Sequence, residues 1–153
     1  MEIGLVLLVV AGVVFVFVGV PAITLRFLAR SLESRIAAAI PADEIVLKDL
    51  RAITFGVQSK GGFQGRGNGA LVLTRQELWF SRAVLRRDLR IPLDAITEVT
   101  TVRSHLGKTY FRGLLRVSFR TQDMTDADAW HVTDLAAWRA KLAELLPTTA
   151  AHT

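Results

Sequence analysis

The chain has 153 residues, which is enough for one domain of ordinary size plus an appendage. It contains no cysteine, which excludes disulfides, thiolate nucleophiles and cysteine-ligated metals. Nineteen Lys and Arg residues against fourteen Asp and Glu residues give a formal net charge of +5. Most of the bases are Arg, whose planar guanidinium suits phosphates and carboxylates, so the composition is compatible with an anionic partner.

The first element in chain order is an uncharged, apolar segment from Ile3 to Leu25. A helix of that length rises far enough to cross a hydrocarbon core about 30 Å thick. A cleaved signal peptide is the competing interpretation, but Glu2 stands where a signal peptide carries Lys or Arg, and the apolar region is long for a signal. We therefore expect an uncleaved transmembrane helix over residues 1–25.

Basic residues follow the apolar segment closely. Arg26, Arg30 and Arg35 lie within about ten residues of its end, whereas only Glu2 and the α-amine precede it. Because cytoplasmic flanks of membrane helices are enriched in Lys and Arg, the sequence predicts a single-pass protein of the cell membrane with its C-terminal domain in the cytoplasm.

Residues 26–41 continue with helical periodicity up to Pro41. Apolar residues recur every four positions at Leu28, Leu32, Ile36 and Ile40. This stripe predicts a juxtamembrane amphipathic helix or linker that packs on the domain or lies at the membrane interface. A dimerisation seam is the sharper alternative, but so few turns are poor evidence for a coiled coil.

Residues 42–146 show short apolar alternations interrupted by Gly, Asn and Asp, as antiparallel strands with turns do. About seven strands are expected, the first of them bent or bulged. They cover Ile45 to Val57, Ala70 to Thr74, Glu77 to Arg82, Arg87 to Ile91, Thr97 to Val102, Leu114 to Thr121 and Ala129 to Val132. The predicted class is mostly β (α+β).

A helix near Asp134 to Leu146 closes the domain, with Asp134 as its N-cap. Its apolar stripe consists of Leu135, Trp138, Leu142 and Leu145. We expect this helix to cap a seven-stranded sandwich or barrel, and residues 147–153 to form a disordered tail.

Two runs of sequence carry a resemblance to a known family. Gly69 to Phe80 contains a strand ending in Leu-Thr, a tight turn and a second strand, and Arg90 to Val99 reads Ile-Pro-Leu-x-x-Ile-x-x-Val. This pattern resembles the bacterial pleckstrin-homology and GRAM-like families over roughly Glu44 to Leu146. The resemblance implies the fold more than the function, because this superfold hosts lipid, peptide and protein binding alike.

The catalytic inventory is thin. His105, His131 and His152 are the only imidazoles, and no two of them have metal-ligand spacing. Asp123, Asp126 and Asp128 lack the Gly and the distal Glu of a Ca²⁺ loop, so a solvated acidic loop is the better interpretation. We expect no enzyme, no metal and no cofactor.

Basic residues near turns are the candidate ligand or lipid contacts. A flexible glycine-rich loop runs from Ser59 to Gly69, and in pleckstrin-like phosphoinositide binders the corresponding loop forms the headgroup site. Ala70 to Leu73 offers no base, which departs from the inositide-binding pattern. The candidates are Lys60, Arg66, Arg82, Arg86, Arg87, Arg103, Lys108 and Arg112.

Trp79 is the candidate interface residue, because alternation places Leu78 and Phe80 inward and Trp79 on the outer face of the strand. It contacts a partner in one interpretation. In the other, which we favour, a segment of the same chain covers it, and the helix from Phe27 to Ile40 is a ready candidate.

The sequence therefore predicts a non-enzymatic, membrane-anchored interaction module that docks on anionic lipid or on a protein partner through a basic face. A homo-oligomer is compatible with this prediction, and nucleic acid is disfavoured because aromatic residues are not interleaved with the bases. The alternative is a structural subunit of a membrane protein complex with no ligand of its own. The plain interpretation of the basic face is an ordinary solvated surface.

Overall fold

The computed structural model describes residues 2–84, 88–122 and 124–146. The helical elements are α1 (Glu2–Val14), the π-helical η1 (Phe15–Gly19), α2 (Val20–Ala39), the short 3-10 helices η2 (Ala42–Glu44), η3 (Gln58–Lys60) and η4 (Leu93–Ala95), and α3 (Leu135–Leu145). The strands are β1 (Ile45–Thr54), β2 (Gly67–Thr74), β3 (Glu77–Arg82), β4 (Asp88–Pro92), β5 (Ile96–His105), β6 (Lys108–Arg120) and β7 (Thr125–His131). The seven strands form one antiparallel sheet in the order β4-β3-β2-β1-β7-β6-β5.

The N-terminal region does not form the transmembrane helix that the sequence predicted. α1 has 13 residues, and a helix of that length rises about 20 Å, less than the ~30 Å hydrocarbon core. The π-helical η1 interrupts the uncharged run, and α2 carries Arg26, Arg30, Glu33 and Arg35. Among the described residues, no helix combines the length and the apolar character needed to cross a membrane. The anchor predicted over residues 1–25 is therefore wrong, and so is the prediction of a single-pass cell-membrane protein with a cytoplasmic domain.

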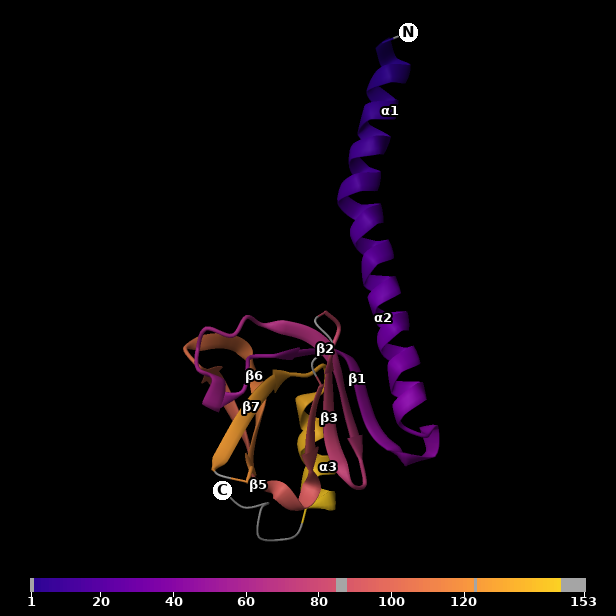
Figure 1. The fold of residues 1–153 in the computed structure, drawn as a ribbon. Coiled ribbons are helices and arrows are strands. Elements are labelled where there is room, and N and C mark those ends of the chain that lie inside the picture. Colours follow the sequence, from indigo (N-terminus) through magenta and orange to yellow (C-terminus); the bar gives the residue numbers. More distant parts are fainter. Residues whose placement is uncertain (1, 85–87, 123, 147–153) are drawn as a thin grey trace.

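The second half of α2 packs on the outer face of the sheet, whereas α1 projects away from the domain (Figure 1) with exposed side chains such as Leu7 and Leu8. The buried cluster consists of Leu32, Ile36 and Ile40 from the helical segment and Ala70, Val72 and Trp79 from β2 and β3. The apolar stripe of residues 26–41 is thus used within its own chain. This is the connecting helix that the sequence favoured over a dimerisation seam.

Arg35 fixes the position of α2 along β3. Its guanidinium donates to the Ser81 hydroxyl and, at 2.9 Å, to the carbonyl oxygen of Arg82. The same group lies 3.6 Å from the Asp88 carboxylate. Since Asp88 also accepts a hydrogen bond from Ser81 at 2.7 Å, one arginine joins α2 to both β3 and β4.

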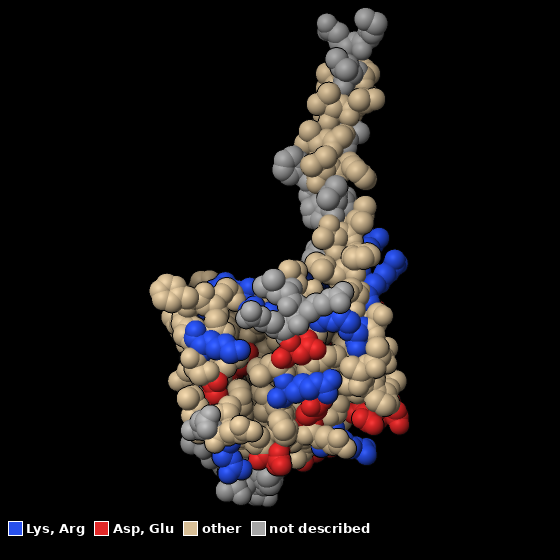
Figure 2. All heavy atoms as spheres, in the orientation of Figure 1, with Lys and Arg blue, Asp and Glu red and all other residues tan. Residues whose placement is uncertain are grey.

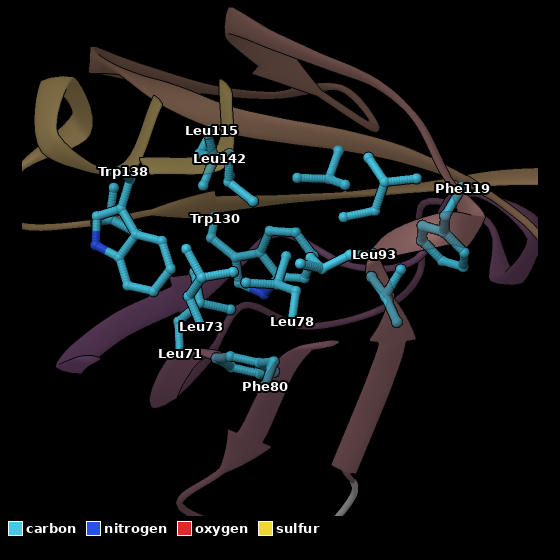
Figure 3. Packing of buried hydrophobic residues seen from close by; sticks show 14 of the residues in the cluster. Leu71, Leu73, Leu78, Phe80, Leu93, Leu115, Phe119, Trp130, Trp138 and Leu142 are labelled. Carbon is cyan, nitrogen blue, oxygen red and sulfur yellow. The ribbon is translucent and has the colours of Figure 1, made fainter. Parts of the chain in front are cut away.

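The sheet divides into two halves that share one core. β1 pairs with β2 over most of its length but with β7 only at Ile53 and Thr54. Register shifts within β1 agree with the bent first strand expected from the sequence. Residues of both halves pack together, and Figure 3 shows Leu73 and Leu78 of one half beside Trp130 of the other. The fold is therefore a β-rich domain whose main core is shared by both halves of the sheet.

α3 completes this core. Asp134 caps the helix by accepting a hydrogen bond from the Ala137 amide at 2.9 Å. Trp138 and Leu142 are buried among the core residues of the sheet. The seven antiparallel strands and the C-terminal helix that the sequence predicted are confirmed. The tail expected at residues 147–153 lies outside the described residues.

Candidate functional site

The loop after β1 and the β5–β6 hairpin are joined into one surface. Lys108 Nζ donates to the carbonyl oxygens of Phe55 at 3.0 Å and Gln64 at 2.5 Å. Arg66 donates to the carbonyl oxygen of Thr109 at 3.2 Å, and its guanidinium lies 4.8 Å from the centre of the Phe55 ring. We call this surface, formed by residues 58–66 and 103–112, the loop face.

The glycine-rich loop is closed by hydrogen bonds of its own, although the sequence favoured a flexible loop. Gly56, whose φ of 109° suits glycine, turns the chain out of β1. The Gln64 side chain accepts from the Val57 amide at 3.1 Å and donates to the carbonyl oxygens of Val57 at 2.6 Å and Gly61 at 2.8 Å. This side chain fills the turn and holds its backbone in one conformation.

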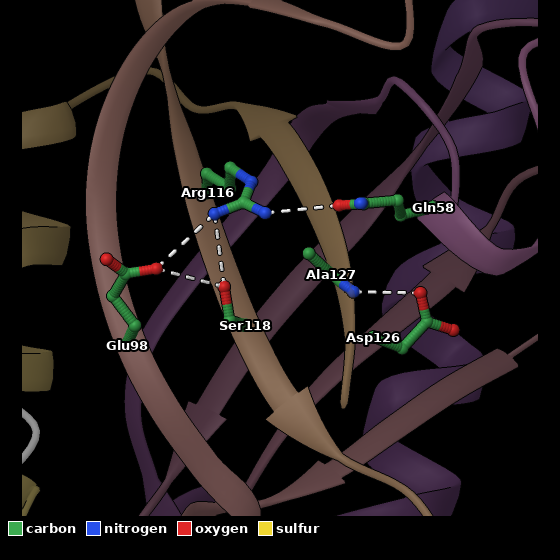
Figure 4. Close-up of polar contacts among 6 residues, drawn as sticks. All are labelled: Gln58, Glu98, Arg116, Ser118, Asp126 and Ala127. Atoms are coloured by element: carbon green, nitrogen blue, oxygen red, sulfur yellow. Dashed lines mark hydrogen bonds and ion pairs between the residues drawn. The ribbon is translucent and has the colours of Figure 1, made fainter. Parts of the chain in front are cut away.

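Asp126 ties η3 to β7. Its carboxylate accepts from the Ser59 amide at 2.9 Å and the Ser59 hydroxyl at 2.5 Å. It also accepts from the Ala127 amide at 2.8 Å (Figure 4). Burial alone would raise the pKa of Asp126, but these hydrogen bonds and the charge of Lys60 lower it below its usual value. The ionised carboxylate therefore holds the turn that presents Lys60 to solvent.

Asp128 lies on the same strand and is more deeply buried than Asp126. Its carboxyl group contacts the Thr54 hydroxyl at 2.9 and 3.0 Å and the Ala129 amide at 2.6 Å. Burial raises the pKa of Asp128 to about 7, although the hydrogen bonds from Thr54 and the backbone oppose the shift. The expected solvated acidic loop is therefore wrong for Asp126 and Asp128, both of which are buried in β7, while Asp123 lies outside the described residues.

Two aromatic rings stand out from the loop face. The exposed fraction is 108% for Phe63 and 99% for Phe111. Lys60 and Arg103 are exposed on the loop face, and their side chains make no hydrogen bond or ion pair with the described part of the chain. In Figure 2, Lys and Arg lie around the end of the body beside the helix and also in its middle and lower parts, where Asp and Glu lie. The loop face thus combines free positive charge with exposed aromatic surface.

Other predicted contacts have structural partners. Arg66 and Lys108 bind loop carbonyls, and Arg82 donates to the carbonyl oxygen of Gly65 at 3.0 Å. Arg86 and Arg87 lie outside the described residues. Trp79, with an exposed fraction of 2%, lies under α2. It is therefore covered by its own chain, the arrangement the sequence favoured, and is not available to a partner.

Two other bases of β6, Arg116 and Arg120, also have partners within the domain. Arg116 lies 3.4 Å from the Glu98 carboxylate and donates to Ser118 at 3.1 Å and to Gln58 at 3.1 Å (Figure 4). Arg120 donates to the carbonyl oxygen of Asp94 at 3.3 Å. The outward basic residues of this strand therefore link β5, η3 and η4.

Sequence analysis missed a groove between the first half of α2 and the sheet. Its cavity volume is about 930 Å³, within the range of small-molecule sites. Arg26, Arg51 and Arg112 reach it from α2, β1 and β6, and Tyr110 and His131 lie at its floor, their rings 4.5 Å apart. These residues are far apart in the sequence, and no spacing signal joins them.

The two described histidines are held by their surroundings. His105, predicted in a loop, is buried at the end of β5, where Nε2 lies 2.8 Å from the carbonyl oxygen of Gly56 and must carry the proton. Burial lowers the pKa of His105 and the pKa of His131. No group of three or more His, Asp or Glu residues in the described ranges is arranged to hold a metal ion.

Comparisons with known proteins add little to this geometry. No family model matches the chain, and no curated protein matches it. A solved structure described as the crystal structure of the C-terminal domain of an unknown protein from Leishmania infantum matches with a TM-score of 0.47 and 14% sequence identity. The match covers 66% of this chain and 82% of that chain. A similarity of this size supports no inference, so the resemblance to the pleckstrin-homology and GRAM-like families stays a prediction.

Proposed function

We propose that the protein is a non-enzymatic binding module whose loop face docks on an anionic lipid surface. The observation that carries the proposal is the pairing of two fully exposed rings, Phe63 and Phe111, with exposed bases on joined loops. An exposed Phe ring can bury its apolar surface at the boundary between water and lipid, and Lys and Arg favour anionic headgroups. The proposal rests on the loop face alone and needs no transmembrane helix.

The magnitudes are sufficient for reversible docking. Burying a Phe side chain is worth about 1.5–3 kcal/mol, and each base near an anionic surface contributes about 1 kcal/mol. Because Arg66 and Lys108 already bind loop carbonyls and Arg112 faces the groove under α2, we assign the free charge to Lys60 and Arg103. Two rings and two bases together support binding that weakens as salt screens the charges.

The proposal is tested by flotation of the full chain with phosphatidylcholine vesicles that contain or lack phosphatidylserine. The double variant Phe63→Ser/Phe111→Ser should weaken binding to the anionic vesicles by about tenfold or more, because each 1.4 kcal/mol is a factor of ten. Met124→Ser is the matched control, since Met124 is exposed in the β6–β7 turn at the other end of β6.

The charge component is tested in the same assay. Lys60→Glu/Arg103→Glu should abolish the preference for anionic vesicles, while Arg75→Glu, in the β2–β3 turn at the opposite end of β2, should leave it intact. A loss in Arg75→Glu about half as large as in the double variant, in proportion to charge changes of −2 and −4, would mean that only net charge matters. That result, or an unaltered preference in both, would overturn the proposal that the loop face is the docking surface.

A further inference from the structure

We infer that the groove between α2 and the sheet binds a single-chain amphiphile with an anionic headgroup. The groove exists because α2 leaves the sheet gradually. Leu32 and Ile36 are buried, Leu28 and Ala29 are half-buried, and Arg26 is exposed. The space that opens beneath the first half of the helix is the cavity of about 930 Å³.

The charge of the groove is entirely positive. Arg26, Arg51 and Arg112 line it from three different elements, and no Asp or Glu is among the described lining residues. None of the three guanidinium groups donates a hydrogen bond or forms an ion pair within the described ranges. Three unpaired guanidinium groups around one space favour a carboxylate or phosphate, which they can bind in a bidentate manner.

The nearest acidic side chain on β1 does not neutralise these arginines. The Asp49 carboxylate accepts from the backbone amide of Arg51 at 2.8 Å and from the amide of Thr133 at 2.6 Å. Asp49 is buried, and its oxygen atoms are engaged by the backbone. The guanidinium of Arg51 therefore keeps its donors for a ligand.

The walls of the groove are apolar. Half-buried side chains of α2, β1 and α3 supply them, namely Leu28, Leu50, Ile53 and Leu135. A free inorganic anion would leave this surface in water, whereas an alkyl chain would cover it. The combination of apolar walls and cationic groups is the complement of an amphiphile with one chain and one anionic end.

An extended peptide fits the groove less well. The strands that line it, β1, β2, β6 and β7, are inner in the sheet order, and where β1 and β7 separate, the Asp49 carboxylate already binds the amides of Arg51 and Thr133. A peptide that adds to a sheet needs the free hydrogen-bonding groups of an edge strand. Recognition here has to come from side chains, which suits a lipid-like ligand.

The test is isothermal titration calorimetry of the full chain with palmitate and with a lysophosphatidate, each below its micelle concentration. We expect both to bind, hexadecanol to bind about tenfold more weakly or not at all because it lacks the charge, and inorganic phosphate alone not to bind. Vesicles are absent, so the assay is independent of docking by the loop face. Phe63→Ser/Phe111→Ser should leave the affinity for palmitate unchanged, which separates a failure of this inference from a failure of the proposed function.

Matched variants on α2 locate the site. Arg26→Ser, combined with Arg51→Ser, should weaken palmitate binding at least about tenfold, whereas Arg30→Ser, an exposed arginine that does not line the groove, should not. Leu28→Ser should weaken binding and Phe27→Ser should not, because Phe27 is exposed outside the groove.

Several results would overturn the inference. One is the absence of binding by either amphiphile to a chain whose circular dichroism shows it folded. Another is an equal effect of Arg26→Ser and Arg30→Ser. A third is hexadecanol binding as tightly as palmitate, which would remove the role of the arginines. Displacement of palmitate by a peptide that binds more tightly would assign the groove to protein recognition instead.

Discussion

Asp126 and Asp128 lie two residues apart on β7, yet their surroundings move their pKa values in opposite directions. Asp126 receives hydrogen bonds from Ser59 that lower its pKa, whereas burial raises the pKa of Asp128 to about 7. The sequence could not show this difference, because both residues appear in one acidic run. The distinguishing partners, Ser59 and Thr54, lie more than sixty positions away.

Asp128 should make folding stability depend on pH. Its folded pKa, about 7, is higher than its usual value of 3.8, so the folded state keeps a proton that the unfolded state loses. The contribution is fully present below pH 4 and is lost as pH rises towards 7, by up to about 1.4 kcal/mol per pH unit. Asp128→Asn, which resembles the protonated carboxyl, should remove this decline. Urea unfolding at several pH values between 4 and 8 measures it, and parallel profiles for the variant and the natural chain would contradict the assignment.

Individual basic residues were the least predictable part of the candidate site. Arg66, Arg82 and Lys108 were correctly expected near turns, but their partners are backbone carbonyls of residues distant in the chain. Every residue carries a backbone carbonyl group, so the residue types in a sequence do not show which carbonyl will accept a hydrogen bond from a given base. The burial of Trp79 was more predictable. Strand alternation placed Trp79 on the outer face of the sheet, and the apolar stripe of residues 26–41 indicated a helix able to cover it.

At the scale of elements, Lys108 holds the β1–β2 loop against the β5–β6 hairpin. Lys108→Met should release the carbonyl oxygens of Phe55 and Gln64 and open the loop. We expect trypsin to cleave at Lys60 and Arg66 several-fold faster in this variant, because local opening exposes the backbone. Lys141→Met is the control, since Lys141 pairs only with Glu144 on the surface of α3. Equal cleavage rates in both variants would show that Lys108 does not hold the loop.

The docking of α2 on the sheet should depend on its buried stripe. Ile36→Ala should lower the free energy of unfolding by about 2–4 kcal/mol, because it leaves a cavity against Trp79 and Val72. Phe27→Ala, at a position with an exposed fraction of 72%, should change it by less than about 0.5 kcal/mol. Urea denaturation compares the two. A small effect of Ile36→Ala would mean that α2 does not pack on the sheet in solution.

The elements themselves were largely predictable, because strand alternation, turn residues and the Asp134 cap are local signals. The strand ends that the sequence analysis placed differently from the structure also have local causes. β2 begins at Gly67, inside the glycine-rich run, and β5 and β6 extend to a tight turn at Leu106 and Gly107, both with positive φ. The largest error was the N-terminal helix. The length of the apolar segment alone indicated one membrane-spanning helix. In the structure, η1 interrupts this segment, and its last residues belong to α2, which also carries charged residues.

For the molecule as a whole, the arrangement of charge matters more than its total. Arginines of α2, β1 and β6 meet at one groove, and on the face shown in Figure 2 the acidic side chains lie away from the end from which the helix projects, with other bases among them. Because screening limits such charges to about 8 Å at physiological salt, only a surface in direct contact would respond to them. The sequence indicated a basic face, but the groove required the fold to bring α2, β1 and β6 together.

The measurement that tests the central claim most directly is flotation of the full chain with vesicles of increasing phosphatidylserine content, at low and at physiological salt. The account predicts that binding rises with anionic lipid, falls as salt increases, and loses both dependences in Lys60→Glu/Arg103→Glu. Binding that is the same with neutral and anionic vesicles at both salt concentrations would contradict it, and would leave the bases of the loop face as a solvated surface.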